Sequence, residues 1–125
     1  MAGASAAPEE VEHVISIEVN GQTFSATLAD NDTARAFAAR LPMTLDMREL
    51  NGNEKYFYLN EPLPAAAQRV GQIRAGDLML FGSDCVVLFY ESFATSYTYT
   101  PIGRIDDPAG LAEALGCGSA EVAFS

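Results

Sequence analysis

Residues 78–91 (LMLFGSDCVVLFYE) contain two apolar runs separated by the turn sequence GSD. Short apolar runs bounded by turn residues are typical of strands that are covered on both faces. We therefore predict that residues 78–81 and 85–91 form the central strands of a sheet. The longest unbroken apolar run, Cys85–Tyr90, has six residues, whereas a membrane-spanning helix needs ~20.

The segment before these strands predicts a hairpin followed by a helix. Apolar and polar residues alternate over Val14–Val19 and again over Gln22–Leu28, and an Asn-Gly dipeptide between them favours a tight turn. Several N-cap candidates follow at residues 30–33. The next apolar residues are spaced as one face of a helix that ends before Pro42, namely Ala34, Phe37, Ala38 and Leu41.

Further short strands and a second helix complete the pattern. Asp107-Pro108 predicts the start of a helix that runs to Leu115 and ends at Gly116. The count of about eight short strands and two short helices indicates a mainly β protein, either a closed or nearly closed barrel or a sandwich. The remaining predicted strands are 43–50, 53–59, 70–74, 96–100 and 120–124.

The length and charge of the chain limit the classes of partner that it can bind. The chain has 125 residues, enough for one domain, and 17 acidic against 7 basic residues give a net charge of −10. This charge argues against nucleic acid and anionic lipid as partners, because both are held by clustered Lys and Arg. Residues 1–13 have neither a basic nor a hydrophobic signal region. We expect a flexible tail at 1–13, a domain at 14–125, and a cytoplasmic monomer or weak homo-oligomer.

The cysteines give no sign of a metal site or a cofactor. Two cysteines and one histidine cannot make the usual four-ligand zinc site without carboxylates. Cys85 lies inside an apolar run and is expected to pack as a small hydrophobic residue. Cys117 lies in a turn between two glycines, and a disulfide between the two cysteines stays open.

An ordered set of segments resembles the small bacterial and archaeal cyclophilin-like domain family. The resemblance covers nearly everything after residue 13 and is specific only as a combination. It implies a closed eight-stranded antiparallel β-barrel with two short helices at its ends. The segments are 20–42, 53–56, 73–82, 87–93, 97–105 and 106–124.

The resemblance carries the fold but not the prolyl isomerase site. True cyclophilins have an Arg, a Phe five residues later and a Gln three beyond that, with Trp and His elsewhere in the groove. None of the six Arg here has Phe at the fifth position after it, there is no Trp, and the one His is His13. Catalytic residues are therefore unassigned, and an isomerase built from other residues stays open.

The candidate site is a groove with aromatic walls and a polar edge. Tyr97 and Tyr99 share one face of a predicted strand, so their rings can form a platform with polar tips. Ser92 and Phe93 follow the end of a central strand, where binding loops are common. The full set of predicted ligand-binding residues is Glu54, Lys55, Tyr56, Ser92, Phe93, Tyr97, Tyr99 and Arg104.

Each of these residues also has a purely structural interpretation. Glu54 and Lys55 can form a surface ion pair that fixes a loop, and the tyrosines can pack across strands. Ser92 can bond a turn, although a Ser92–Lys55 catalytic pair stays open. Arg104 can pair with Asp106 or Asp107, which alternatively cap the second helix.

Three function classes remain. The leading hypothesis is a domain that binds a peptide segment or a small molecule without standard isomerase chemistry. The alternative is an enzyme, either an atypical prolyl isomerase or another small enzyme that uses Lys55, Glu54, Glu91 or Arg104. The third is an interaction module whose surface docks a protein.

Overall fold

The computed structural model describes residues 13–125. The predicted tail at 1–13 lies, apart from His13, outside the described residues. Neither helix of this part of the chain has the length and hydropathy that crossing a membrane requires.

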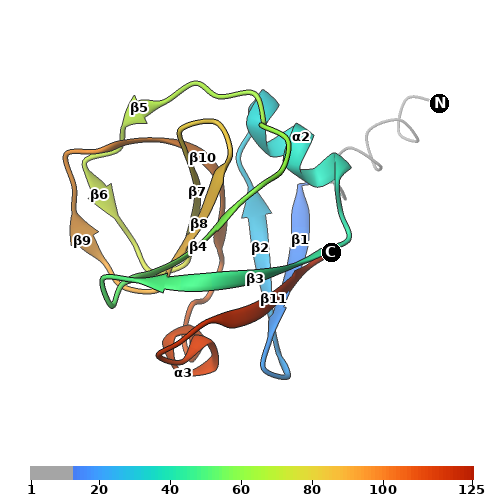
Figure 1. Cartoon of the computed structure of the whole chain (residues 1–125), viewed down its shortest axis with the longest axis vertical. Coiled ribbons are helices and arrows are strands. Elements are labelled where there is room, and N and C mark those ends of the chain that lie inside the picture. Colours follow the sequence, from blue (N-terminus) through green and yellow to red (C-terminus); the bar gives the residue numbers. More distant parts are fainter. Residues whose placement is uncertain (1–12) are drawn as a thin grey trace.

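Eight strands close into an antiparallel barrel (Figure 1). This confirms the predicted mainly β fold and the choice of a barrel over a sandwich. The closing pair is β10 with β2, in which Gly103 lies opposite Leu28. Around the barrel the order is β2 (Gln22–Leu28), β1 (Val14–Val19), β11 (Ala120–Phe124), β3 (Met43–Leu50), β4 (Glu54–Tyr58), β8 (Cys85–Phe89), β7 (Asp77–Phe81) and β10 (Thr98–Ile105).

The strands of the 78–91 stretch are buried on both faces, as predicted. Their inward side chains, among them Leu80 and Leu88, join the main core inside the barrel. Their outward side chains, among them Val87 and Phe89, join a second apolar cluster on the outer face. Cys85 is buried in this second cluster, Cys117 is exposed, and both thiols are free.

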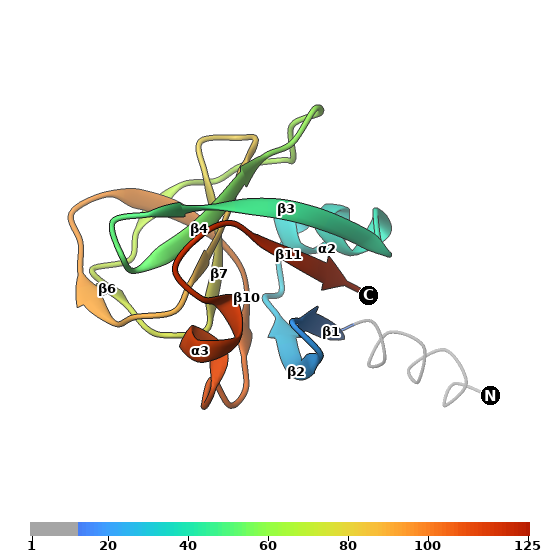
Figure 2. The same cartoon turned by 60° about the horizontal axis from the view of Figure 1, so that its bottom comes forward.

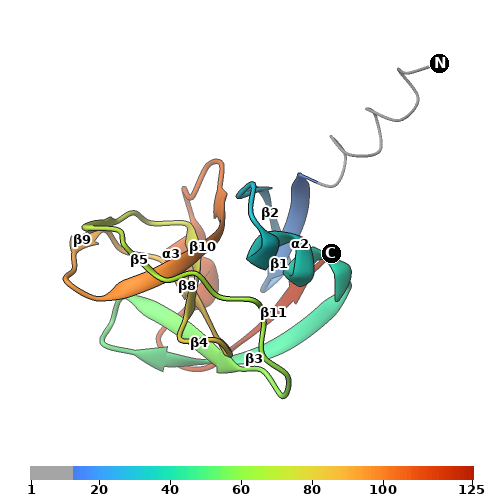
Figure 3. The same ribbon diagram turned by 90° about the horizontal axis from the view of Figure 1, so that it is seen from above.

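A cover of three short strands lies over this outer face. β5 (Gln68–Arg69) pairs with the start of β10, while β6 (Gln72–Ile73) and β9 (Phe93–Ala94) form a small sheet of their own. Figures 1 and 3 show these strands on the side of the barrel away from β1 and β2. Ile73 and Phe93 pack on the second cluster from this cover.

Two helices lie at opposite ends of the barrel (Figures 1 and 2). The longer one, α2 (Asp32–Ala39), starts after Asn31, whose side chain accepts a hydrogen bond from the Ala34 amide at 2.7 Å. Its Phe37 packs edge-on against Phe124 of β11, with ring centroids 5.4 Å apart. The shorter one is α3 (Leu111–Leu115).

Several predicted boundaries were wrong, among them that of the strand expected at 85–91, which ends at Phe89. The strand expected at 70–74 is shorter, at Gln72–Ile73 (β6), and a separate two-residue strand, β5, precedes it across Gly71 with φ +74°. The strand expected at 96–100 continues to Ile105, because a bulge after Pro101 accommodates the missing amide donor. The second helix begins at Leu111 rather than beside Pro108, since Asp107 accepts the Ala109 amide in a turn that precedes it.

Candidate functional site

A groove of about 710 Å³ lies on the outer face of the barrel. Alternate residues of a strand point to the same face, so Glu54, Tyr56 and Tyr58 of β4 all point outward. Tyr56 and Tyr58 lie opposite Val87 and Cys85 of β8, and all four side chains line the groove. The floor of the groove is therefore set by the β4–β8 register.

Aromatic rings from four further segments form the walls. Phe81 ends β7, Phe93 belongs to β9, Tyr97 precedes β10 and Tyr99 lies within it. The Phe81 ring lies 6.2 Å from that of Tyr97 and 5.7 Å from that of Tyr99, between centroids. These spacings are those of interacting aromatic pairs, so the rings of Phe81, Tyr97 and Tyr99 make one continuous wall.

Most of the exposed large hydrophobic side chains of the described residues lie in the groove. Within residues 13–125, five large hydrophobic side chains are exposed, and four of them line this groove: Leu50, Tyr58, Phe81 and Tyr97. Tyr58 is 60% exposed and Tyr97 65%. A contiguous apolar surface of this kind is typical of a binding site, whereas scattered exposed residues are not.

Glu54 is the one charged side chain among the residues that line the groove. It is 8% exposed, and no described residue donates a hydrogen bond to its carboxylate. Burial raises its pKa above the ordinary value, and the negative charge of Glu49 raises it further. Beside it, the side-chain oxygen of Asn53 is buried with no hydrogen-bond partner among the described residues.

Lys55 points the opposite way from Glu54 and has no exposed surface. Its ammonium donates to Glu49 Oε1 at 2.8 Å and to the carbonyls of Gly116 and Gly118 at 2.7 and 2.6 Å. An ammonium has three protons, so all its donors are used. Lys55 thus fastens the loop after α3 to the β3–β4 pair.

Glu49, which is partly exposed, completes the cluster around the buried Lys55. Its Oε1 also accepts the Tyr90 hydroxyl at 2.8 Å, and its Oε2 accepts the Gly52 amide at 2.6 Å. Burial alone would raise the pKa of Glu49, but the hydrogen bonds from Lys55, Tyr90 and Gly52 outweigh it and the pKa is lowered. The ion pair of Lys55 is therefore with Glu49, not with the adjacent Glu54.

Arg104 lies outside the groove. Its Nε donates to Asp77 Oδ1 at 2.8 Å, so its partner is neither Asp106 nor Asp107, the two residues of the structural alternative. Asp106 instead accepts the Thr27 hydroxyl at 2.7 Å. Arg104 lines a separate cavity of about 650 Å³, together with Arg69 and Arg74.

Ser92 also lies outside the groove. Its Oγ accepts the backbone amide of Ala75 at 3.0 Å, which is the turn-bonding role weighed for it. Because Lys55 Nζ is bonded to three oxygens in the interior, it is not available as a base for Ser92. The Ser92–Lys55 pair therefore does not form.

The structure brings five of the eight predicted site residues to one groove: Glu54, Tyr56, Phe93, Tyr97 and Tyr99. It places Lys55, Ser92 and Arg104 elsewhere. Sequence reasoning missed Tyr58, although strand alternation puts it on the face of Tyr56. It also missed Phe81, whose place in the wall depends on the pairing of β7 with β10 and has no local signal.

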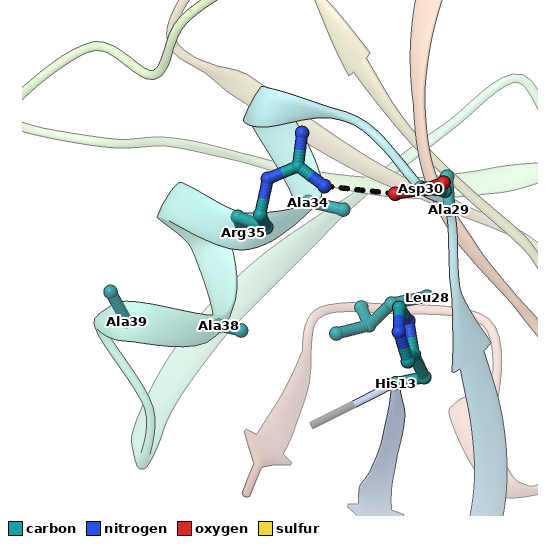
Figure 4. Close-up of a pocket in the computed structure, with 8 residues that line it drawn as sticks. All are labelled: His13, Leu28, Ala29, Asp30, Ala34, Arg35, Ala38 and Ala39. Carbon is teal, nitrogen blue, oxygen red and sulfur yellow. Dashed lines mark hydrogen bonds and ion pairs between the residues drawn. The ribbon is translucent and has the colours of Figure 1, made fainter. Parts of the chain in front are cut away.

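A further cavity, of about 600 Å³, lies between α2 and the β1–β2 hairpin. Figure 4 shows His13 and Leu28 across from the helix, with Arg35 joined to Asp30. Arg35 also pairs with Asp32, so its charge is already matched, and several alanines make up the helix side. This cavity lacks the aromatic wall and the unpaired charge of the groove.

No group of three or more His, Cys, Asp or Glu side chains in the described part of the chain is arranged to hold a metal ion.

Comparison with protein-family models gives a match over most of the chain. Residues 17–125 match a family model described as the cyclophilin-like family. No curated protein matches the chain. The family match confirms the resemblance carried by the ordered segments of the sequence.

Proposed function

The chain belongs to the cyclophilin-like family, and we propose that it binds a peptide segment or a small ligand in the aromatic groove, without standard prolyl isomerase chemistry. One observation carries this proposal: rings from β4, β7, β9 and β10 converge on a single cavity. Four of the exposed large hydrophobic side chains lie there. A volume of about 710 Å³ falls within the range of small-molecule sites.

Ligand binding in the groove would be stabilised by burial of the apolar ring surfaces, while the hydroxyl tips of the tyrosines stay hydrogen-bonded. Covering the exposed rings stabilises a complex by roughly 25 cal/mol per Å² of apolar surface removed from water. The tyrosine hydroxyls keep their bonds to water or take one to the ligand. A flat apolar group, such as a proline ring, an aromatic ring or a sugar face, suits this platform.

The lining of the groove supports binding rather than isomerase chemistry. The cyclophilin reaction uses an Arg beside the imide nitrogen, and no Arg is among the residues that line the groove. Lys55, Glu54 and Arg104, the set considered for an enzyme, do not share a cavity. We expect purified protein at micromolar concentration to give no acceleration in a protease-coupled proline assay, and clear acceleration would favour the enzyme instead.

Ligand-observed NMR with a panel of small aromatic and prolyl fragments tests the groove. Tyr97→Ala removes an exposed wall ring and is expected to abolish most saturation-transfer signals without unfolding the domain. Val14→Ala is the matched control, because Val14 is also an exposed hydrophobic residue, 53% accessible, but lies on β1. Equal signals from wild type and Tyr97→Ala would exclude the groove as the binding site.

A further inference from the structure

The charge of the groove narrows the class of ligand. Among its lining residues the one ionisable group that carries charge at neutral pH is Glu54, since the tyrosines and Cys85 are neutral there. The basic residues nearest in sequence, Lys55 and Arg48, do not line it. A negatively charged ligand group therefore finds no cationic side chain among the lining residues and is repelled by the Glu54 carboxylate.

Glu54 is an acceptor without a donor on a largely buried residue. The residue is 8% exposed and receives no side-chain hydrogen bond from residues 13–125, while its carboxylate oxygens are not among the buried unpartnered atoms, so they remain accessible where Glu54 lines the groove. Buried carboxylates are normally paired or hydrogen-bonded, because leaving a charge unmatched in low dielectric is costly. The unpartnered side-chain oxygen of Asn53, next in the chain, adds a second acceptor at the same end of the groove.

The rings around Glu54 favour the same kind of group. Tyr56 and Tyr99 line the groove with it, and its charge is close enough to add to the burial that raises the pKa of Tyr99. Aromatic faces attract cations through their quadrupole. A carboxylate between aromatic rings is thus complementary to a cation that carries an apolar body.

We propose that the groove selects a protonated amine on an aromatic or aliphatic body, with the ammonium bonded to Glu54 and the body against Phe81, Tyr97 and Tyr99. This inference rests on the proposed function, because it names the ligand class of the same groove. The net charge of −10 supports it, since the whole molecule attracts cations. Glu54 is then a specificity-determining residue.

Three probes of matched shape test the proposal: phenylbutylamine, phenylbutanol and phenylbutyrate, measured by calorimetry at neutral pH. We expect the amine to bind about tenfold or more tightly than the alcohol, and the acid to bind weakest. Glu54→Gln keeps the side-chain shape and removes the charge. It is expected to remove the preference for the amine over the alcohol, mainly by weakening the binding of the amine.

Glu18→Gln is the control, because Glu18 is an exposed carboxylate on β1, away from the groove. It should leave all three affinities unchanged. A further comparison uses a capped glycine peptide with one central lysine and the same peptide with acetyl-lysine in its place. It distinguishes a peptide side chain from a free amine as the source of the ammonium.

The failures of the two proposals are distinguishable. An alcohol that binds as tightly as the amine, or a Glu54→Gln variant that keeps the amine preference, overturns the amine selectivity and leaves groove binding intact. If none of the three probes binds, the proposed amine selectivity is also overturned for ligands of this shape. Groove binding itself is decided separately by the fragment panel with Tyr97→Ala.

Discussion

Lys55 and Glu54 are neighbours in sequence with opposite surroundings. Lys55 gives its three protons to Glu49 and two loop carbonyls inside the protein, while Glu54 lines the groove with no donor. Strand alternation predicts that the two side chains point to opposite faces. It does not predict the destination of Lys55, because Gly116 and Gly118 are 61 and 63 residues away in the chain.

Replacing Lys55 should strongly destabilise the fold. Lys55→Met leaves the Glu49 carboxylate and two carbonyls without their buried donor, which is expected to cost about 3–5 kcal/mol of unfolding free energy. Urea denaturation measures it. Arg48→Met is the control, since Arg48 is an exposed cation on the adjacent strand, and it should change stability by about 0.5 kcal/mol or less. Equal effects of the two substitutions would contradict the assigned role of Lys55.

The raised pKa of Glu54 predicts a pH-dependent gain in stability for Glu54→Gln. A carboxyl whose pKa in the folded protein is above its ordinary 4.5 favours folding when protonated, and this contribution is lost as pH rises through the raised pKa. The variant should therefore unfold at higher urea than wild type at neutral pH.

The advantage of Glu54→Gln should vanish below pH 4.5, where the carboxyl is protonated in both folded and unfolded states. The titratable groups whose charges interact with that of Glu54, namely Glu49, Tyr99 and Cys85, are present in both proteins. A variant less stable than wild type at neutral pH would show that ionised Glu54 stabilises the fold.

The strand elements differ in how far their sequences predict them. The opening hairpin and the 78–91 pair were predicted because turn residues and apolar patterns agree locally. The cover strands β5, β6 and β9 have two residues each, too few for any periodicity. The continuation of β10 through Pro101 depends on its pairing with β7 and β2, which no local pattern encodes.

The pairing of β10 with β2 closes the barrel through a close backbone approach at Gly103. A Cβ added there would lie 2.7 Å from the Thr27 carbonyl oxygen and 3.3 Å from Leu28 Cα, so the two strands must separate. Gly103→Ala is expected to cost about 1–3 kcal/mol of unfolding free energy, measured by thermal or urea denaturation.

Gly118→Ala provides the matched control for the Gly103 substitution. It adds the same atom where nothing lies within 4 Å and the backbone needs no positive φ. Its stability should equal or slightly exceed that of wild type. Similar losses at the two glycines would mean that the β2–β10 approach does not limit the fold.

At the scale of the whole molecule, the excess of acidic residues favours the same ligand class as the groove, a cation. From composition alone, the charge of −10 only argued against nucleic acid and anionic lipid as partners, and Lys55 and Arg104 were predicted as ligand-binding residues of the groove. The structure pairs both cations with carboxylates and leaves a carboxylate in the groove. Net charge and local charge therefore favour the same kind of ligand.

Added salt should weaken amine binding, because it screens the long-range attraction between the acidic protein and the cation. The screening length falls from ~30 Å at 0.01 M to ~10 Å at 0.1 M ionic strength. We expect the affinity for phenylbutylamine to fall several-fold across this range, and that for phenylbutanol to stay constant, in calorimetric titrations. Equal salt dependence of the two probes would show that net charge plays no part.

The most direct test of the groove as the binding site is amide chemical-shift mapping of the nitrogen-labelled protein, titrated with the tightest fragment from the panel. We expect the largest shifts on Glu54–Tyr58 and on residues 93–99. The largest shifts at α2 and the β1–β2 hairpin, or around Arg69, Arg74 and Arg104, would contradict it.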